Sequence, residues 1–103
     1  MALNVGLYVR LEAAEGKEDA VADFLRSAQS LVEQEPDTLV WYALQIGPST
    51  FAILDAFEDD GGRQAHLNGA VARGLGDNAD LFAKPPEIHE IDVLAATGRP
   101  TGS

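Results

Sequence analysis

One pattern occurs twice along this chain of 103 residues and limits what the chain can fold into. In each copy, a short run of alternating apolar and polar residues precedes an amphipathic helical run, and a second alternating run follows. The first copy covers residues 4–46 and the second covers residues 50–94. Only Gly47-Pro48-Ser49 lies between them, a combination typical of a tight turn. The pattern therefore predicts two strand–helix–strand halves joined by a turn.

Two such halves in one sheet give the order β-α-β-β-α-β, the ferredoxin-like arrangement of an α+β domain. The expected strands cover residues 4–11, 38–46, 50–57 and 87–94, the expected helices cover 17–34 and 62–73, and a short helical turn is expected within 77–83. We predict a four-stranded antiparallel sheet with both helices on one face. Because the second and third strands carry apolar side chains on both faces, we expect a second copy to cover the free face, giving a homodimer.

The two expected helices differ in quality. In the first, apolar residues recur at the i, i+3, i+4 spacing of a buried helix face. The residues predicted to be buried there are Val21, Phe24, Leu25, Ala28, Leu31 and Val32. The second helix is poor by propensity because Gly61, Gly62, Gly69 and Gly74 each cost about 1 kcal/mol relative to alanine in a helix interior. Tertiary packing must therefore hold the second helix in place.

Composition excludes several classes of protein. Seven Lys and Arg against 17 Asp and Glu give a formal charge of −10, which disfavours binding to nucleic acid or to an anionic membrane surface. The chain has no cysteine, so a disulfide framework, a thiolate metal site and a thiol nucleophile are excluded. With no basic, apolar leader and no apolar run of membrane-spanning length, we expect a soluble cytoplasmic protein. Residues 1–95 are expected to form one domain and residues 96–103 a flexible tail.

Four segments resemble antibiotic biosynthesis monooxygenase domains, in matching order and over nearly the whole chain. Such domains begin their first helix with Gly-Lys-Glu, carry Glu-Pro-Gly before the second strand, place a His-Leu pair on the second helix, and approach the last strand through prolines. The corresponding segments here are Ala14-Glu15-Gly16-Lys17-Glu18, Glu35-Pro36-Asp37-Thr38, Asp55-Ala56-Phe57-Glu58-Asp59 with Ala65-His66-Leu67, and Pro85-Pro86-Glu87-Ile88. The chain departs from the family pattern at Asp37, where glycine is usual, and at Gly61-Gly62, where helix formers are usual.

The resemblance implies a dimeric α+β barrel with a cavity between each sheet and its helices. Some members of the family oxygenate phenols, quinols or polyketide anthrones without metal or flavin, and others degrade haem. The haem-degrading branch combines an Asn on the first strand, a Trp at the end of the third and a His on the second helix. Asn4 and His66 match that set, but Ala56 and Phe57 occupy the Trp region. Haem degradation is therefore not expected.

His66 is the candidate catalytic residue. A neutral imidazole can take a proton from a phenol near pH 7, and the phenolate formed can pass an electron to oxygen without a metal. The structural alternative is a histidine at the helix–sheet junction that bonds a backbone carbonyl. A metal site is poorly supported, because His66 and His89 lie on different elements and no acidic cluster has ligand spacing.

Polar and aromatic residues on the expected strands are candidates for binding an aromatic substrate. They are Asn4, Tyr8, Arg10, Trp41, Tyr42 and Phe57. An amide, a phenol, a guanidinium and an indole around a cavity can anchor a flat ring and stabilise an oxyanion. The alternative is that this polar face is a dimer interface or solvent-exposed surface, and that Trp41 is a core or interface anchor.

The resemblance thus implies a cofactor-independent monooxygenase of a small phenolic, quinol or polyketide-type aromatic. The alternative is a non-catalytic dimeric binding or stress-related module with the same fold. Polar residues in an enclosed pocket favour the enzyme, whereas a cavity filled by Trp41, Phe51 and Phe57 favours the module.

Overall fold

The computed structural model describes residues 3–97, and the expected tail at 96–103 lies outside this range except for Ala96 and Thr97. The elements follow the predicted order, with one helical segment divided in two. They are β1 (Val5–Glu12), α1 (Glu18–Val32), β2 (Val40–Gln45), β3 (Thr50–Phe57), α2 (Asp60–Leu67), α3 (Ala70–Asp77), the 3-10 turn η1 (Ala79–Leu81) and β4 (Glu87–Asp92).

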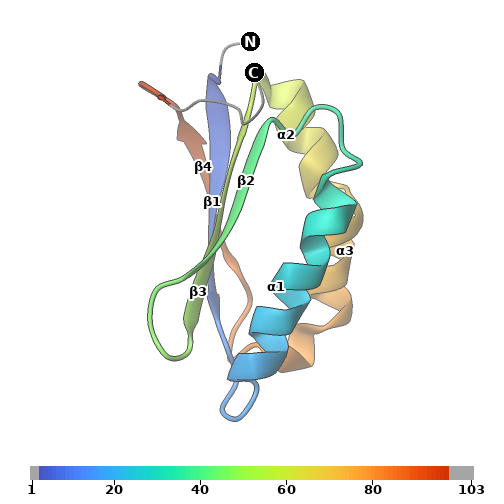
Figure 1. Cartoon of the computed structure of the whole chain (residues 1–103), viewed down its shortest axis with the longest axis vertical. Helices are drawn as coiled ribbons and strands as arrows, with labels where there is room; N and C mark the ends of the chain where they lie inside the picture. The colour runs from blue at the N-terminus through green and yellow to red at the C-terminus, as the bar shows by residue number, and fades with distance from the viewer. Residues whose placement is uncertain (1–2, 98–103) are drawn as a thin grey trace.

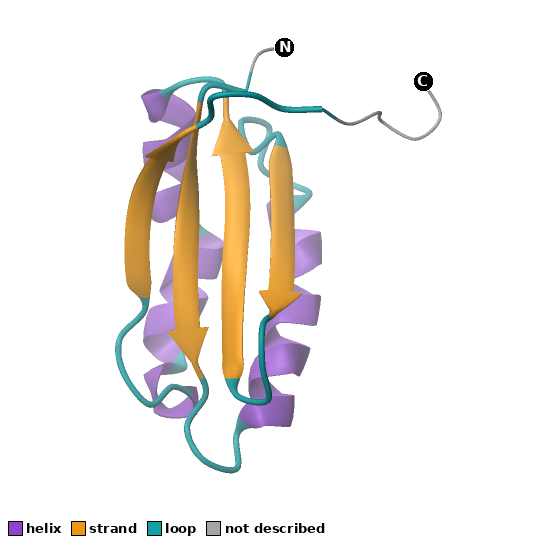
Figure 2. Cartoon of the chain, turned by 90° about the vertical axis from the view of Figure 1, so that its left-hand side faces the viewer, coloured by secondary structure: helices purple, strands orange, loops and turns teal. Residues whose placement is uncertain are grey.

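All four strands form one antiparallel sheet in the order β2-β3-β1-β4. The helices lie together on one side of this sheet, and the opposite side is bare (Figures 1 and 2). This arrangement confirms the predicted ferredoxin-like α+β fold. No helix within residues 3–97 is long and apolar enough to cross a membrane.

The core lies between the helices and the inner face of the sheet. Odd-numbered residues of β1 and β3 point inward, as the period of two in a strand requires. The largest of them are fully buried: Leu7, Leu11, Phe51, Ile53 and Phe57. On α1 the buried residues are Val21, Leu25, Ala28 and Val32. Central β3, which has a neighbour on both sides, is the best-buried strand.

Two expectations about the helices are wrong. Leu31 is 43% exposed, because the buried stripe of α1 is narrower than predicted and Leu31 lies at its flank. The expected single helix over residues 62–73 is two helices, since Gly69 has extended backbone and acts as the N-cap of α3. Asn68 ends α2, and its side-chain amide donates to the carbonyl of Gln64 at 2.9 Å. The bounds of β1, β2 and β4 also differ from prediction by one or two residues, whereas those of β3 agree.

One of the glycines that make α2 a poor helix, Gly62, has a packing role. An added Cβ there would lie 3.1 Å from the Cβ of Asp37 and 3.3 Å from its carbonyl oxygen. A glycine therefore lets α2 approach the loop that follows α1. Asp59 caps this helix by accepting a hydrogen bond from the backbone N–H of Gly62 at 3.0 Å.

The bare face of the sheet exposes several large apolar side chains along β2 and the turn after it. Tyr42 is 56% exposed, Leu44 is 40% exposed and Ile46 is 53% exposed. Exposed side chains of this size gathered on one face are typical of a surface that meets a partner.

Gly6→Ala should destabilise the fold by about 1–3 kcal/mol, the usual cost of overpacking. The reason is that a Cβ at Gly6 would clash with the backbone carbonyl oxygen of Asp55 on β3, and this oxygen cannot move without moving the strand. Gly76→Ala is the matched control, because within residues 3–97 a Cβ added at Gly76 would have no atom within 4 Å apart from its chain neighbours and the backbone of its own helix, α3. Urea denaturation should show that the control raises the free energy of unfolding by up to about 1 kcal/mol. Equal effects of the two substitutions would contradict the close approach at Gly6.

Candidate functional site

The site is built around His66, which is only 7% exposed on the sheet-facing side of α2. The imidazole Nδ1 lies 2.6 Å from Oε1 of Glu35, and Nε2 lies 3.1 Å from Oδ2 of Asp55. A carboxylate therefore faces each nitrogen of the ring. We call Glu35, His66 and Asp55 the buried triad.

Three separate elements bring the triad together. Glu35 lies in the loop after α1, where Pro36 prevents the helix from continuing. Asp55 points inward from the middle of β3, between Leu7 on β1 and Trp41 on β2. His66 lies in the last turn of α2, where a positive charge suits the helix dipole. The fold therefore has to form before the triad exists.

Neighbouring groups fix the position of each member. Thr38 Oγ1 donates to Oε1 of Glu35 at 2.7 Å, so this oxygen accepts from both the hydroxyl and the imidazole. The ring of Phe57 packs against the imidazole, with 5.5 Å between ring centroids. Asp55 is 1% exposed, and its contact with His66 is an ion-pair contact without the alignment of a hydrogen bond.

Burial and charge act on His66 in opposite directions. Burial is the largest single influence and by itself lowers the pKa of His66. The carboxylates of Asp55 and Glu35 together outweigh burial and raise the pKa above its ordinary value of 6.5. The protonated ring has an N–H for each carboxylate, whereas a neutral ring can donate from one nitrogen only. The geometry therefore favours the imidazolium form.

A shallow cavity of about 160 Å³ adjoins the outer end of the triad. It lies between the loop after α1 and α2. Its lining residues are Gln34, Glu35, Pro36, Asp37, Thr38, Gly62, Ala65 and His66. Glu35 lines this cavity, and its second oxygen, Oε2, has no hydrogen bond among residues 3–97.

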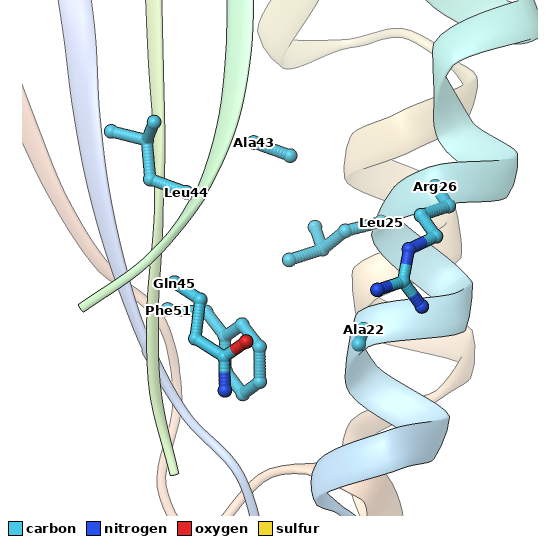
Figure 3. Close-up of a pocket in the computed structure, with 7 residues that line it drawn as sticks. All are labelled: Ala22, Leu25, Arg26, Ala43, Leu44, Gln45 and Phe51. Atoms are coloured by element: carbon cyan, nitrogen blue, oxygen red, sulfur yellow. The ribbon is translucent and has the colours of Figure 1, made fainter. Parts of the chain in front are cut away.

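A smaller cavity of about 100 Å³ lies between α1 and the edge strand β2, lined by Ala22, Leu25, Arg26, Ala43, Leu44, Gln45 and Phe51 (Figure 3). Arg26 at this cavity pairs with exposed Asp23 at 3.0 Å. Its lining holds no carboxylate or imidazole that could exchange a proton near pH 7. The triad cavity is therefore the better candidate for chemistry.

The other residues predicted for the site lie on different faces. Trp41 and Phe57 are on the inner face with His66, whereas Tyr42 is on the outer face. Tyr8 and Arg10 are also on the outer face, paired across β1 and β4 with His89 and Glu87.

Asn4 lies before β1, where its side-chain amide donates to the carbonyl of Glu58 at 2.9 Å. Asn4, Tyr8, Arg10 and Tyr42 thus do not share a site with the triad within one chain.

Sequence reasoning selected His66 but missed its two carboxylate partners. A signal for Asp55 was present, because it is the one acidic residue on the apolar face formed by Phe51, Ile53 and Phe57. Such a residue in a core needs a partner of opposite charge or a hydrogen-bond donor. Glu35 gave no comparable signal in its loop.

Replacing His66 by glutamine should remove a contribution to stability that depends on pH. Folding favours protonated His66, because its pKa is higher in the folded state than its ordinary 6.5. This contribution is complete well below pH 6.5, where the unfolded state is also protonated. It is lost as the pH rises through the higher pKa of the folded state.

The free energy of unfolding of the native protein minus that of H66Q should therefore fall as the pH is raised above 6.5. Urea denaturation across this range measures the difference. His89→Gln, at the exposed histidine of β4, is the control and should leave the pH dependence of the native protein in place. A difference that is constant or grows with pH would contradict the ion-pair geometry.

Comparison with protein-family models and with curated proteins finds no match. Among solved structures, a protein of unknown function from Nitrosomonas europaea is 50% identical, with a TM-score of 0.92 and 97% of each chain covered. A second protein from that organism, named "putative antibiotic biosynthesis monooxygenase", is 22% identical, with a TM-score of 0.81 and coverage of 95% of this chain and 97% of that one.

A protein from Pseudomonas aeruginosa is also 22% identical, with a TM-score of 0.78 and coverage of 92% and 98%. At such identities the likeness is one of fold.

Proposed function

Because the chain belongs to the family of the Nitrosomonas europaea protein of unknown function and has the fold of antibiotic biosynthesis monooxygenase domains, we propose that it is a cofactor-independent monooxygenase of a small phenol or hydroquinone. The observation that carries this proposal is the buried triad beside an open cavity. A charged cluster of this kind is costly to bury, and it supplies a proton acceptor where a ligand can reach it.

Glu35 is the member that contacts the substrate in this proposal. Its side chain is 21% exposed, whereas both ring nitrogens of His66 already face carboxylates. A phenol in the cavity gives its hydroxyl proton to Oε2 of Glu35, and the imidazolium of His66 stabilises the negative charge nearby. His66 and Thr38 are then positioning residues that hold the carboxylate in place.

Molecular oxygen is the second substrate. The phenolate passes one electron to oxygen, the two radicals join at a ring carbon, and the peroxide formed takes back the proton held by Glu35 to become a hydroperoxide. Loss of water from this hydroperoxide leaves a quinone. One oxygen atom is thus added to the ring, the other leaves as water, and the two hydrogens of that water come from the phenol.

The size of the cavity limits the substrate. Drug-sized ligands occupy pockets of about 300–1,000 Å³, whereas this cavity holds about 160 Å³. A single aromatic ring fits such a volume better than a fused polyketide. Asp37, which stands where related domains usually carry glycine, narrows the cavity further and adds a negative charge at its edge.

A non-catalytic binding module is the second candidate. It is favoured by the packing of the inner face, where Phe51 is 2% exposed, Phe57 is 0% exposed and Trp41 packs against the same cluster. These three residues pack together in the layer between the sheet and its helices, where the family cavity was expected. On this alternative the triad only anchors the loop after α1.

Glu35→Gln should lower turnover of a single-ring hydroquinone by about 10²–10⁴-fold, the usual cost of losing a general base. Oxygen uptake without added metal, flavin or haem measures turnover. Glu33→Gln is the matched control, because Glu33 is exposed two residues earlier in the chain. H66Q should also lower turnover and should alter its pH profile. Unchanged turnover in folded E35Q would exclude the proposed base, and no uptake with any phenol or hydroquinone would favour the module.

Both candidates include a homodimer formed through the bare face of the sheet. Support comes from Tyr42, Leu44 and Ile46, whose exposed apolar surface a second copy would cover. Leu44→Glu should convert the dimer to a monomer in sedimentation experiments, because it would bury a carboxylate in the interface.

Leu31→Glu is the control, since Leu31 is similarly exposed, at 43%, but lies on the helical side. A native protein that sediments as a monomer at micromolar concentration would contradict the dimer.

A further inference from the structure

Three polar atoms in the interior have no hydrogen-bond partner among residues 3–97. They are both carboxylate oxygens of Asp55 and the indole Nε1 of Trp41. Buried polar groups in proteins are nearly always hydrogen-bonded, and an unpaired buried carboxylate is especially costly. Contact with the imidazole of His66 offsets part of that cost at Oδ2. Oδ1 and the indole N–H lack such compensation.

The two side chains leave directly opposed positions of neighbouring strands. Trp41 on β2 pairs with Asp55 on β3, so both side chains project to the inner face of the sheet. Side chains at opposed positions have Cβ atoms about 4.5–5.5 Å apart. The two side chains are therefore neighbours on the inner face.

Within the described residues 3–97, no polar group is hydrogen-bonded to these atoms, and their known neighbours besides His66 are apolar. Leu7 is the partner of Asp55 on β1, and it is fully buried. Trp41 packs against the apolar cluster of Ala28, Val32 and Val71. An ionised carboxylate only accepts hydrogen bonds and an indole N–H only donates. A single group that satisfies both must donate and accept at once, which a hydroxyl does and an ammonium or a carbonyl does not.

We propose that the inner face of the sheet holds a hydroxyl-binding position between Asp55 and Trp41, at the opposite end of the triad from the open cavity. The hydroxyl donates to Oδ1 of Asp55 and accepts from Nε1 of Trp41. It belongs either to an internal water molecule or to a small alcohol or phenol. In the second case the phenol occupies a subsite separate from the cavity beside Glu35, and that reading rests on the proposed function because it takes the same class of ligand.

Trp41 provides a direct probe, because it is the only tryptophan of the chain and gives one indole N–H signal. In a ¹⁵N-labelled sample without ligand, the indole proton should show a dipolar cross-peak to a long-lived water molecule. Titration with 4-ethylphenol then separates the two sources. If water occupies the position, the cross-peak persists. If the phenol occupies it, contacts from the phenol ring replace the water cross-peak.

Conservative variants test the phenol arm. Trp41→Phe removes the N–H but keeps an aromatic ring, and it should lower the affinity for 4-ethylphenol about tenfold in calorimetry if the phenol occupies the position. Tyr42→Phe is the matched control, since it removes a hydroxyl from the neighbouring residue on the outer face. Asp55→Asn should shift the indole signal in either case, because it changes the acceptor of the bridging hydroxyl.

An indole proton that contacts neither water nor phenol would overturn the proposal, as would an indole signal unaffected by D55N. Oxygen uptake is a separate measurement, so failure of the proposed monooxygenase activity leaves the water arm of this test intact. Conversely, oxygen uptake by a protein whose indole proton contacts no hydroxyl would support the proposed function and exclude the hydroxyl-binding position.

Discussion

The rest of the structure around the candidate site depends on one ion-paired cluster, in which the imidazole of His66 lies between the carboxylates of Glu35 and Asp55. Each carboxylate alone would be expensive to enclose, and each is compensated by the same ring. The contacts join the loop after α1, helix α2 and the central strand β3. Because α2 is short and rich in glycine, these contacts and the packing at Gly62 hold it where its propensity cannot.

The sheet separates two kinds of surface. The inner face carries the core, the triad and the side chain of Trp41, while the outer face carries Tyr8, Arg10 and exposed Tyr42. Residues one apart in a strand therefore serve different purposes, as the neighbours Trp41 and Tyr42 illustrate. A ligand that contacts both sets needs either two chains or two separate positions.

Much of this architecture could be predicted from the sequence. The duplicated pattern is long and regular, so it gave the element order and the exact bounds of β3, and most of the buried stripe of α1 follows from helical spacing. The break between α2 and α3 escaped prediction because Gly69 reads equally as a weak helix residue or as a cap.

The site was less predictable because its members are distant in sequence. His66 could be selected by residue type, but its partners are distant in sequence. Glu35 lies 31 residues before it, in a loop, and Asp55 lies on strand β3. Alternation alone shows that Trp41 and Tyr42 point to opposite faces, yet only the packing of the helices tells which face is inside. The acidic Asp55 among apolar neighbours was the clearest signal left unused.

The energetics of the triad separate the two functional candidates. Replacement of a buried ionic cluster by apolar side chains of similar volume is often neutral or even stabilising, by about 1–4 kcal/mol. A chain that needed only to anchor a loop could therefore do so with leucine and phenylalanine at the positions of Asp55 and His66. The two carboxylates instead raise the pKa of the His66 imidazole above its ordinary value, and one of them borders an open cavity. Such an arrangement has a physical cost in folding that an anchor does not require, and this cost supports the proposed role in proton transfer over simple anchoring.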